Sequence, residues 1–300
     1  MIIAQIILTM AAFLFFSFQT APRAGGDNDL KLLLEKSVPT ETGQKLRVDV
    51  VAGNVKVTSW EKNEVYVKVY GNDEAEENVD FEISPDASGV KVEALKKSGV
   101  HNLHSISLKF EIKVPLNYRV SVSSGGGNVT MTDQNGDVDV STKGGNVSLG
   151  RINGDIDVST AGGNINVKGN TGTLKLSTAG GNINAGEFNG SVEVSTAGGN
   201  IHLTGSDGKV EASTAGGNIH FDYTGKNMGV ELSTMAGQIS LDLPSDFDAD
   251  ADLSTMVGKI KCDFNGSSSK GTSNLKTKFN NGGEPLKCST MAGNIKVTKK

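Results

Sequence analysis

The sequence is poor in the residues that fill a wide globular core. Aromatic residues make up only 5% of the 300 residues, with a single tryptophan, and hydrophobic residues make up 36%. Proline is scarce, with 6 residues, whereas glycine is abundant, with 38. A thin slab between two β-sheets about 10 Å apart needs only valine, isoleucine and leucine side chains. The composition therefore favours one elongated domain over two compact ones.

A strong charge of either sign is also missing. The formal net charge is −5, and no basic stripe is present, so the sequence predicts no nucleic-acid partner. The sequence contains no Gly-x-Ser-x-Gly elbow, phosphate-binding loop, Cys-x-x-Cys pair or His-Glu-x-x-His motif. Each of these motifs carries a known chemistry. We therefore expect no catalytic, cofactor-binding or metal-binding residues, and we expect that the protein is not an enzyme.

Only one long hydrophobic run occurs, at the N-terminus. Ile2 to Phe18 is apolar apart from three polar residues, and the small residues Ala21 and Ala24 follow. This pattern predicts a secretory signal peptide over residues 1–24. The run is also just long enough to stay as a membrane anchor, so membrane association through this segment stays open. Export predicts a secreted, periplasmic or cell-surface protein.

The abundant feature is one motif at a fixed step. Ser-Thr-Ala-Gly-Gly-Asn-Ile at residues 195–201 recurs nearly unchanged, and its aligned serines differ by 18 (141 − 123, 159 − 141). The regular serines are Ser123, Ser141, Ser159, Ser177, Ser195 and Ser213, followed by a looser series of Ser233, Ser254 and Ser289. A sustained period of this kind marks a repeat architecture.

Within each repeat, apolar and polar residues alternate. Val138, Val140 and their equivalents are apolar, whereas Asp139 between them is polar. A period of two predicts a half-buried strand. A second strand follows the glycines, as in Asn164-Ile165-Asn166-Val167. Each repeat therefore predicts two short strands joined by glycine-rich corners.

The sameness of the corners favours a parallel β-solenoid with about 18 residues and two short strands per coil. In a solenoid each residue lies about 4.8 Å above its equivalent, so identical side chains can form a hydrogen-bonded ladder. The predicted structural ladder is Asn146, Asn164, Asn182, Asn200 and Asn218. Antiparallel β-hairpin repeats are the alternative, because Gly144-Gly145 and its equivalents also suit hairpin turns.

The same residues carry a family resemblance. The repeated Gly-Asn-Ile cores, Ala52-Gly53-Asn54-Val55, and Val114-Pro115-Leu116-Asn117-Tyr118 resemble the DUF4097 group of β-strand-repeat putative adhesins, which are GIN-domain-like. The resemblance covers about residues 37 to 300. It implies a secreted or envelope-exposed bacterial β-solenoid, and it supplies no catalytic or ligand-binding residues.

The repeat pattern divides the mature chain into three parts. Residues 25–120 predict an N-terminal β region that caps the solenoid, with an acidic solvated loop at residues 72–78. Residues 121–243 are the regular array. Residues 244–300 hold divergent repeats, with residues 265–283 expected to leave the coil surface as a mobile loop or hairpin. Ser289 then returns to the repeat and closes the chain.

Three groups of side chains are candidates for chemistry. Asp137, Asp139, Asp155 and Asp157 predict two stacked acidic pairs, either a Ca²⁺ site or, as we favour, a solvated acidic face. His202 and His220 share one outward column, but a firm metal site needs three or four ligands. Cys262 and Cys288 fall in inward columns, where they would form either a disulfide or two buried free thiols.

The sequence as a whole favours an exported, non-enzymatic cell-envelope protein that acts as an adhesin or surface interaction protein. Its partner would be a cell-surface or envelope component, either protein or glycan. An envelope-stress or regulatory binding module is the first alternative. A carbohydrate-active β-helix enzyme is the second, because such enzymes use carboxylate-bound Ca²⁺ on a similar scaffold.

Overall fold

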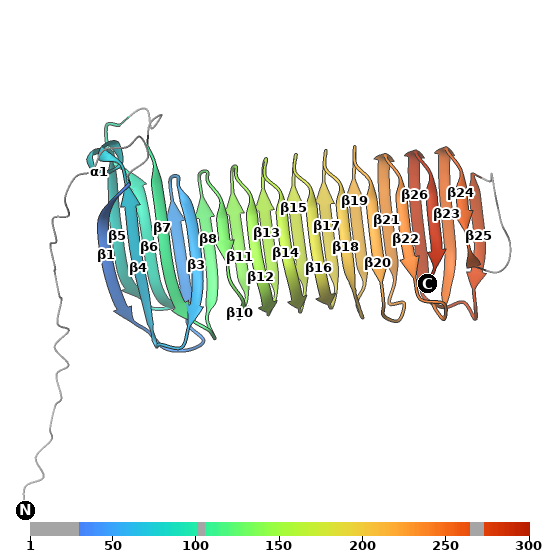
Figure 1. Cartoon of the computed structure of the whole chain (residues 1–300), viewed down its shortest axis with the longest axis horizontal. Helices are drawn as coiled ribbons and strands as arrows, with labels where there is room; N and C mark the ends of the chain where they lie inside the picture. Colours follow the sequence, from blue (N-terminus) through green and yellow to red (C-terminus); the bar gives the residue numbers. More distant parts are fainter. Residues whose placement is uncertain (1–29, 101–105, 265–272) are drawn as a thin grey trace, which may run out of the picture.

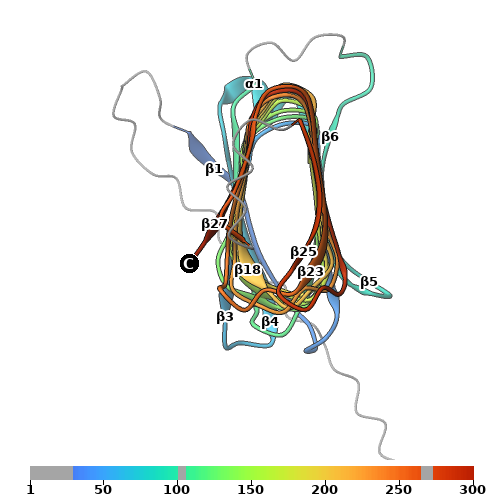
Figure 2. The same cartoon turned by 90° about the vertical axis from the view of Figure 1, so that its right-hand side faces the viewer.

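The computed structural model describes residues 30–100, 106–264 and 273–300, and the predicted signal peptide lies outside this part. The chain forms two long sheets that face each other as the walls of a flattened slab (Figures 1 and 2). In spatial order, sheet A contains β1 (Lys31–Pro39), β4 (Glu64–Gly71), β7 (Leu108–Pro115), β3 (Asn54–Trp60), β9 (Val129–Met131), β12 (Val147–Asn153), β14 (Ile165–Thr171), β16 (Ile183–Asn189), β18 (Ile201–Ser206), β20 (Ile219–Tyr223), β22 (Ile239–Leu243), β27 (Ile295–Lys299) and β24 (Ile260–Cys262), with β10 (Gln134–Asn135) beside β12.

Sheet B forms the opposite wall. Its spatial order is β25 (Asn274–Phe279), β23 (Ala249–Val257), β26 (Pro285–Ala292), β21 (Val230–Ala236), β19 (Val210–Thr214), β17 (Val192–Thr196), β15 (Leu174–Thr178), β13 (Ile156–Thr160), β11 (Val138–Thr142), β8 (Arg119–Ser124), β2 (Lys45–Val50), β6 (Gly89–Lys96) and β5 (Val79–Asp86). Along the repeats, every neighbouring pair in both sheets is parallel.

The register of these strands follows the sequence period. Val138 pairs with Ile156, and Ser177 pairs with Ser195, so paired residues are 18 positions apart (156 − 138, 195 − 177). The parallel β-solenoid is therefore confirmed, and the antiparallel hairpin alternative is wrong. Equivalent residues stack because each coil presents the same apolar columns to the slab.

The core is a single layer of aliphatic side chains between the walls. Ile183 of sheet A and Val194 of sheet B are each 1% exposed, and the buried hydrophobic residues form one continuous cluster. Larger rings fill the slab toward the C-terminal half, where Phe188, Phe221 and Tyr223 lie in contact. Complete burial of each aliphatic side chain stabilises the fold by roughly 1.5–3 kcal/mol.

At the N-terminal end, the chain does not add its coils in sequence order. The coil of β2 and β3 lies directly beside the regular array, against β8 and β9. The chain then passes outward to β6 and β7 before it returns to β8. Antiparallel strands cover this end: β5 pairs with β6, β4 pairs with β7, and β1 pairs with β4. Antiparallel pairing with chain folded back on itself covers strand edges that would otherwise be bare.

The C-terminal end mirrors this arrangement. The last coil in the sequence, β26 and β27, returns to the repeat, but in space it lies between the coil of β21 and β22 and the coil of β23 and β24. Only part of the insertion expected at residues 265–283 is described. Residues 274–279 form strand β25, which extends sheet B antiparallel to β23, and residues 265–272 lie outside the described part.

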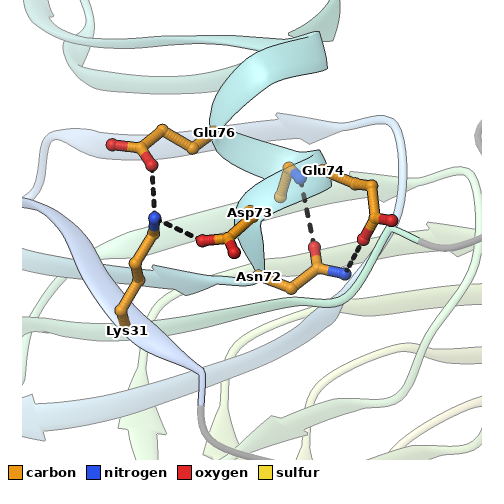
Figure 3. A network of polar contacts seen from close by, with 6 residues as sticks. Lys31, Asn72, Asp73, Glu74 and Glu76 are labelled. Carbon is orange, nitrogen blue, oxygen red and sulfur yellow. Dashed lines mark hydrogen bonds and ion pairs between the residues drawn. The ribbon is translucent and has the colours of Figure 1, made fainter. Parts of the chain in front are cut away.

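The acidic segment after β4 is a short helix and not the loop that the sequence predicted. Helix α1 (Asp73–Asn78) begins at the N-cap Asn72, whose side chain accepts a hydrogen bond from the Ala75 N–H at 3.1 Å. The ammonium group of Lys31 lies between Asp73 and Glu76, and it is 2.6 Å from Asp73 Oδ1 (Figure 3). N-capping and acidic residues in the first turn stabilise a helix N-terminus. No helix in the described residues combines the length and apolar character needed to cross a bilayer.

Candidate functional site

Two corners join the sheets, and they differ in sequence. The constant corner connects sheet B to sheet A and carries the Thr-Ala-Gly-Gly-Asn motif, as at residues 196–200. The variable corner connects sheet A back to sheet B, as at residues 206–209, and its sequence changes along the array. Val210 pairs with Val230, 20 positions away (230 − 210), so this corner gains two residues in that coil. Repeat proteins commonly place such variation at their binding face.

The asparagine ladder lies on the constant corner, but its bonds differ from the expected side-chain stacking. Each Asn Oδ1 accepts a hydrogen bond from the backbone N–H of the equivalent residue in the next coil. Asn164 accepts from Asn182 at 2.8 Å, and Asn182 accepts from Asn200 at 2.8 Å. The row runs from Asn54 through Asn128, Asn146, Asn164, Asn182, Asn200 and Asn218 to Gln238.

A buried threonine supports the same corner. The Thr196 hydroxyl donates to the carbonyl of Gly181 at 3.0 Å and accepts from the N–H of Gly199 at 3.2 Å. Thr196 is only 6% exposed, and Thr178 and Thr214 repeat both bonds. Buried polar groups need such partners because an unsatisfied group costs about 1–3 kcal/mol. The constant corner is therefore a structural device whose polar groups are already engaged.

The acidic candidates do not form a metal cluster. Asp137 Oδ1 accepts a hydrogen bond from the N–H of Asp155 at 3.1 Å, and Asp155 Oδ1 accepts from the N–H of Thr173 at 2.8 Å. These two carboxylates thus link successive coils at the variable corner, as the asparagines do at the constant corner. Asp139 and Asp157 are paired neighbours in the outward column of sheet B, and Lys175 follows Asp157. Among the described residues, no group of three or more His, Cys, Asp or Glu side chains is arranged to hold a metal ion.

A cavity lies on the variable corner near the C-terminal end. This downstream cavity has a volume of about 1040 Å³. It is lined by Asp207, Thr224, Gly225, Lys226, Asn227, Ser245, Asp246, Phe247, Asp248, Asn280, Asn281, Gly282, Gly283 and Glu284. Asn227 holds its walls together, because its amide donates to the carbonyls of Asp248 and Glu284. The lining is rich in carboxylate, amide and hydroxyl groups.

A smaller upstream cavity of about 350 Å³ lies on the same corner. Arg151 and Glu187 line it and form an ion pair at 2.6 Å across two coils. Gln134 and Asn170 also line it, and both are buried with a side-chain oxygen that lacks a hydrogen-bond partner. The variable corner thus leaves polar groups unsatisfied where the constant corner engages them.

Backbone strain is also concentrated at the variable corner. In the described residues, the non-glycine residues with positive φ are Glu187 (46°), Asp207 (54°) and Asn280 (49°). Glu187 lines the upstream cavity, and Asp207 and Asn280 line the downstream cavity. Such conformations cost free energy and often mark functional sites. In the sequence, this region differs from the constant corner only in that its residues and its length change between coils, and it carries no known catalytic or binding motif.

The two histidines lie side by side on the outer face of sheet A. Their ring centroids are 4.8 Å apart, and the rings are nearly parallel. Burial and the neighbouring His220 lower the pKa of His202. His220 Nε2 lies 3.7 Å from Asp242 Oδ2. The pair is therefore a stacked surface contact that lacks the third ligand that a firm metal site requires.

The cysteines both point into the slab. Cys262 and Cys288 are buried and are free thiols in the structure. Burial raises the pKa of both thiols, and Cys262 also acts on Cys288 electrostatically. A raised pKa keeps a thiol protonated and unreactive. A disulfide between them stays a prediction.

Comparison with known proteins assigns the fold to a family. The family model described as Toastrack DUF4097 matches residues 43–298. The chain belongs to this family. The match begins after β1 and includes the regular array, the divergent coils and the residues that line both cavities. No curated protein matches the chain.

The solved structures that match the chain have low sequence identity to it. A putative adhesin from Bacteroides fragilis is 15% identical, with a TM-score of 0.46, and the match covers 90% of this chain and 97% of that one. A putative adhesin from Parabacteroides distasonis is 12% identical, with a TM-score of 0.42 and coverage of 91% and 98%. A putative adhesin from Parabacteroides merdae is 10% identical, with a TM-score of 0.41 and coverage of 89% and 96%.

Proposed function

We propose that this Toastrack protein is exported and acts as a non-enzymatic adhesin that binds a hydroxyl-rich glycan of a cell surface or envelope in the downstream cavity. The observation that carries the proposal is the position of this cavity. It opens where the variable corner gains two residues relative to the coils before it. The rigid array thus presents a loop-built polar cavity, as binding proteins commonly do.

The chemistry of the cavity suits sugar hydroxyl groups. Asp246 and Glu284 are exposed carboxylates in its lining, and Ser245 and Thr224 add hydroxyl groups. Ionised carboxylates only accept hydrogen bonds, whereas a sugar offers many O–H donors. A volume of about 1040 Å³ is also large enough for a short oligosaccharide, because sites for small ligands measure about 300–1,000 Å³.

The absence of catalysis is part of the proposal. Asp137 and Asp155, half of the acidic set that suggested a polysaccharide lyase, accept hydrogen bonds from the variable-corner backbone. Catalysis by a nucleophile requires a base and an orienting third group within reach. Two of the four carboxylates in the acidic set are thus bound to the backbone of the corner, which supports binding without turnover. The apolar segment at residues 2–18, followed by small residues, supports export.

The test measures binding and turnover on the same panel of neutral and acidic glycans. We expect at least one glycan to bind, with no product formed, with or without Ca²⁺. The variant D246N/E284Q should weaken this binding about tenfold or more, because each lost charge-assisted hydrogen bond contributes roughly 1.5–3 kcal/mol. The variant E193Q/E211Q makes the same charge change on sheet B and should bind like the parent.

Three outcomes would overturn the proposal. Equal loss of binding in both variants would assign the affinity to net charge and not to the cavity. Product formation by the parent that disappears in a variant with Asp137, Asp139, Asp155 and Asp157 all changed to Asn would make the acidic face an active site. Binding of peptides but no glycan would favour the regulatory alternative.

A further inference from the structure

The constant corner changes its chemistry in the last three coils in space. In the regular array, the residue after the buried threonine is Lys143, Ala161, Ala179, Ala197 or Ala215. In the three C-terminal coils it is Met235, Met291 and Met256. These methionines are 56%, 50% and 74% exposed. The corner backbone accepts alanine or lysine at this position, so the fold does not require methionine there.

The three methionines form one row. β21 pairs with β26, and β26 pairs with β23, in a register that sets Thr234, Thr290 and Thr255 side by side and also Ala236, Ala292 and Val257. The methionines stand between these two rows, so successive side chains are about 4.8 Å apart. Val257 is itself 71% exposed. We name Met235, Met291, Met256 and Val257 the methionine corner.

Lysines flank the methionine corner on the sheet A side. Lys259 follows Val257 by two residues, Lys261 lies two residues further on, and Lys296 pairs with Lys261. All three are exposed, and none has an ion-pair partner among the described residues. On the sheet B side, the residues that precede the threonines are serines. The corner is therefore apolar at its tip and basic on one flank.

We propose that the methionine corner inserts into the surface of a lipid bilayer that contains anionic lipids. Its shape favours this occupant over a protein. A stable protein interface needs about 800 Å² from each partner, whereas this row is only about 10 Å long and lies on the convex edge of a thin slab. A lipid bilayer, in contrast, can enclose the side chains of a narrow convex edge from all sides. Apolar side chains beside lysines match the interfacial region and its anionic headgroups.

Flexible side chains suit this role. Methionine is unbranched and adapts to irregular apolar surroundings. The buried threonines that precede the methionines hold the backbone in place, because Thr234, Thr290 and Thr255 donate to the carbonyls of Gly217, Gly237 and Gly293. Only the methionine side chains therefore need to adjust on insertion. This site lies on the corner opposite the downstream cavity, so the proposal does not depend on glycan binding.

The experiment uses the full-length protein and vesicles of phosphatidylcholine with or without phosphatidylglycerol. We expect cosedimentation that increases with phosphatidylglycerol. The variant M235S/M256S/M291S should lower the partition coefficient about tenfold or more, because three apolar side chains are removed from the bilayer. The matched control is Met228→Ser, which removes an equally exposed methionine at 54% on the variable corner. The variant K259Q/K261Q/K296Q should lose the dependence on phosphatidylglycerol.

A second readout separates insertion at this corner from binding by the N-terminal apolar segment, which all variants share. A tryptophan introduced as Met291→Trp should shift its fluorescence to the blue on vesicles and be quenched by brominated lipids. Met228→Trp should show neither effect. Three results would overturn the proposal: no vesicle binding by the parent, unchanged binding by the triple serine variant, or an unshifted spectrum for Met291→Trp. A dimer in sedimentation that the serine variant abolishes would instead assign the corner to a second copy of the chain.

Discussion

The two corners of the solenoid solve the same problem, the reversal of the chain between two walls, in different ways. The constant corner repeats one motif, and each coil adds an asparagine bond and a threonine bridge to the coil before it. The variable corner changes its sequence and length, and it holds both cavities and the strained residues. The comparison indicates that one corner fixes the stacking, which leaves the other free to vary.

Close backbone packing explains why one glycine of the constant corner, Gly199 in its coil, cannot be replaced. A Cβ added at Gly199 would overlap the carbonyl oxygen of Gly181 in the neighbouring coil. A Cβ added at the adjacent Gly198 would be 3.8 Å from its nearest neighbour, the carbonyl oxygen of Gly180, which is ordinary contact. Close packing between coils therefore requires glycine at position 199 but not at position 198. Substituting each glycine by alanine tests this difference.

The largest expected effect is that of Gly199→Ala. Because the clash is with backbone and not with a movable side chain, the coils must separate locally, and we expect a loss of about 3 kcal/mol or more in the free energy of unfolding. Gly198→Ala should change it by no more than about 0.5 kcal/mol. Urea unfolding of both variants checks this. Similar losses for the two would show that close coil packing is not what the motif protects.

Thr196→Val should have the next largest effect. The substitution keeps the volume of the side chain but leaves the carbonyl of Gly181 and the N–H of Gly199 without their buried partner. We expect a loss of about 1–3 kcal/mol. Ser195→Ala, one residue earlier and exposed, should be close to neutral. If calorimetry found the two variants equally stable, water would be replacing the threonine bridge.

The sequence was informative where the physics is local and repeated. The 18-residue step fixes which residues stack, and the alternation of Val192, Glu193 and Val194 fixes which of them face the slab. The sequence did not reveal what each asparagine bonds to. The asparagine side chain was expected to hydrogen-bond to the equivalent side chain in the next coil. In the structure its Oδ1 instead accepts a hydrogen bond from the backbone N–H of the equivalent residue, as Asn182 does from Asn200.

The ends could not be predicted in the same way. Every coil presents the same kind of apolar side chains to the slab, so any coil could pack against any other. The sequence of a single coil therefore does not show that β26 lies between β21 and β23. Strand β25 pairs antiparallel with β23, a contact between segments that have no repeat motif in common. The helix at Asp73 depends on the cap by Asn72 and on Lys31, which lies about 40 residues away in sequence and was not considered with it. The cavities of the variable corner likewise depend on contacts between loops.

A third prediction sharpens the contrast between the corners. Glu187 has a φ of 46° at the variable corner, a conformation that glycine adopts without a Cβ penalty. Glu187→Gly removes this strain together with an exposed ion pair to Arg151, which contributes little because solvent screens it. We expect the free energy of unfolding to be unchanged or raised by up to about 1 kcal/mol. A loss beyond 1 kcal/mol would mean that the ion pair, and not the constant corner, stabilises these coils.

The smallest expected effect concerns His202, which follows the constant corner by two residues. Burial first, and then the neighbouring His220, lower its pKa below the ordinary value of 6.5, whereas Asp222 opposes the shift. Below that pH the unfolded chain binds more protons at this position than the folded chain does, so stability must fall as the pH drops through 6.5. His202→Asn places in this column the residue that Asn184 already provides one coil earlier, and it removes the titrating group. Thermal unfolding at about pH 8 and about pH 5 should therefore show a smaller acid-induced loss for the variant than for the parent. An identical loss in both proteins would mean that the protonation of His202 does not contribute to the acid sensitivity of the array.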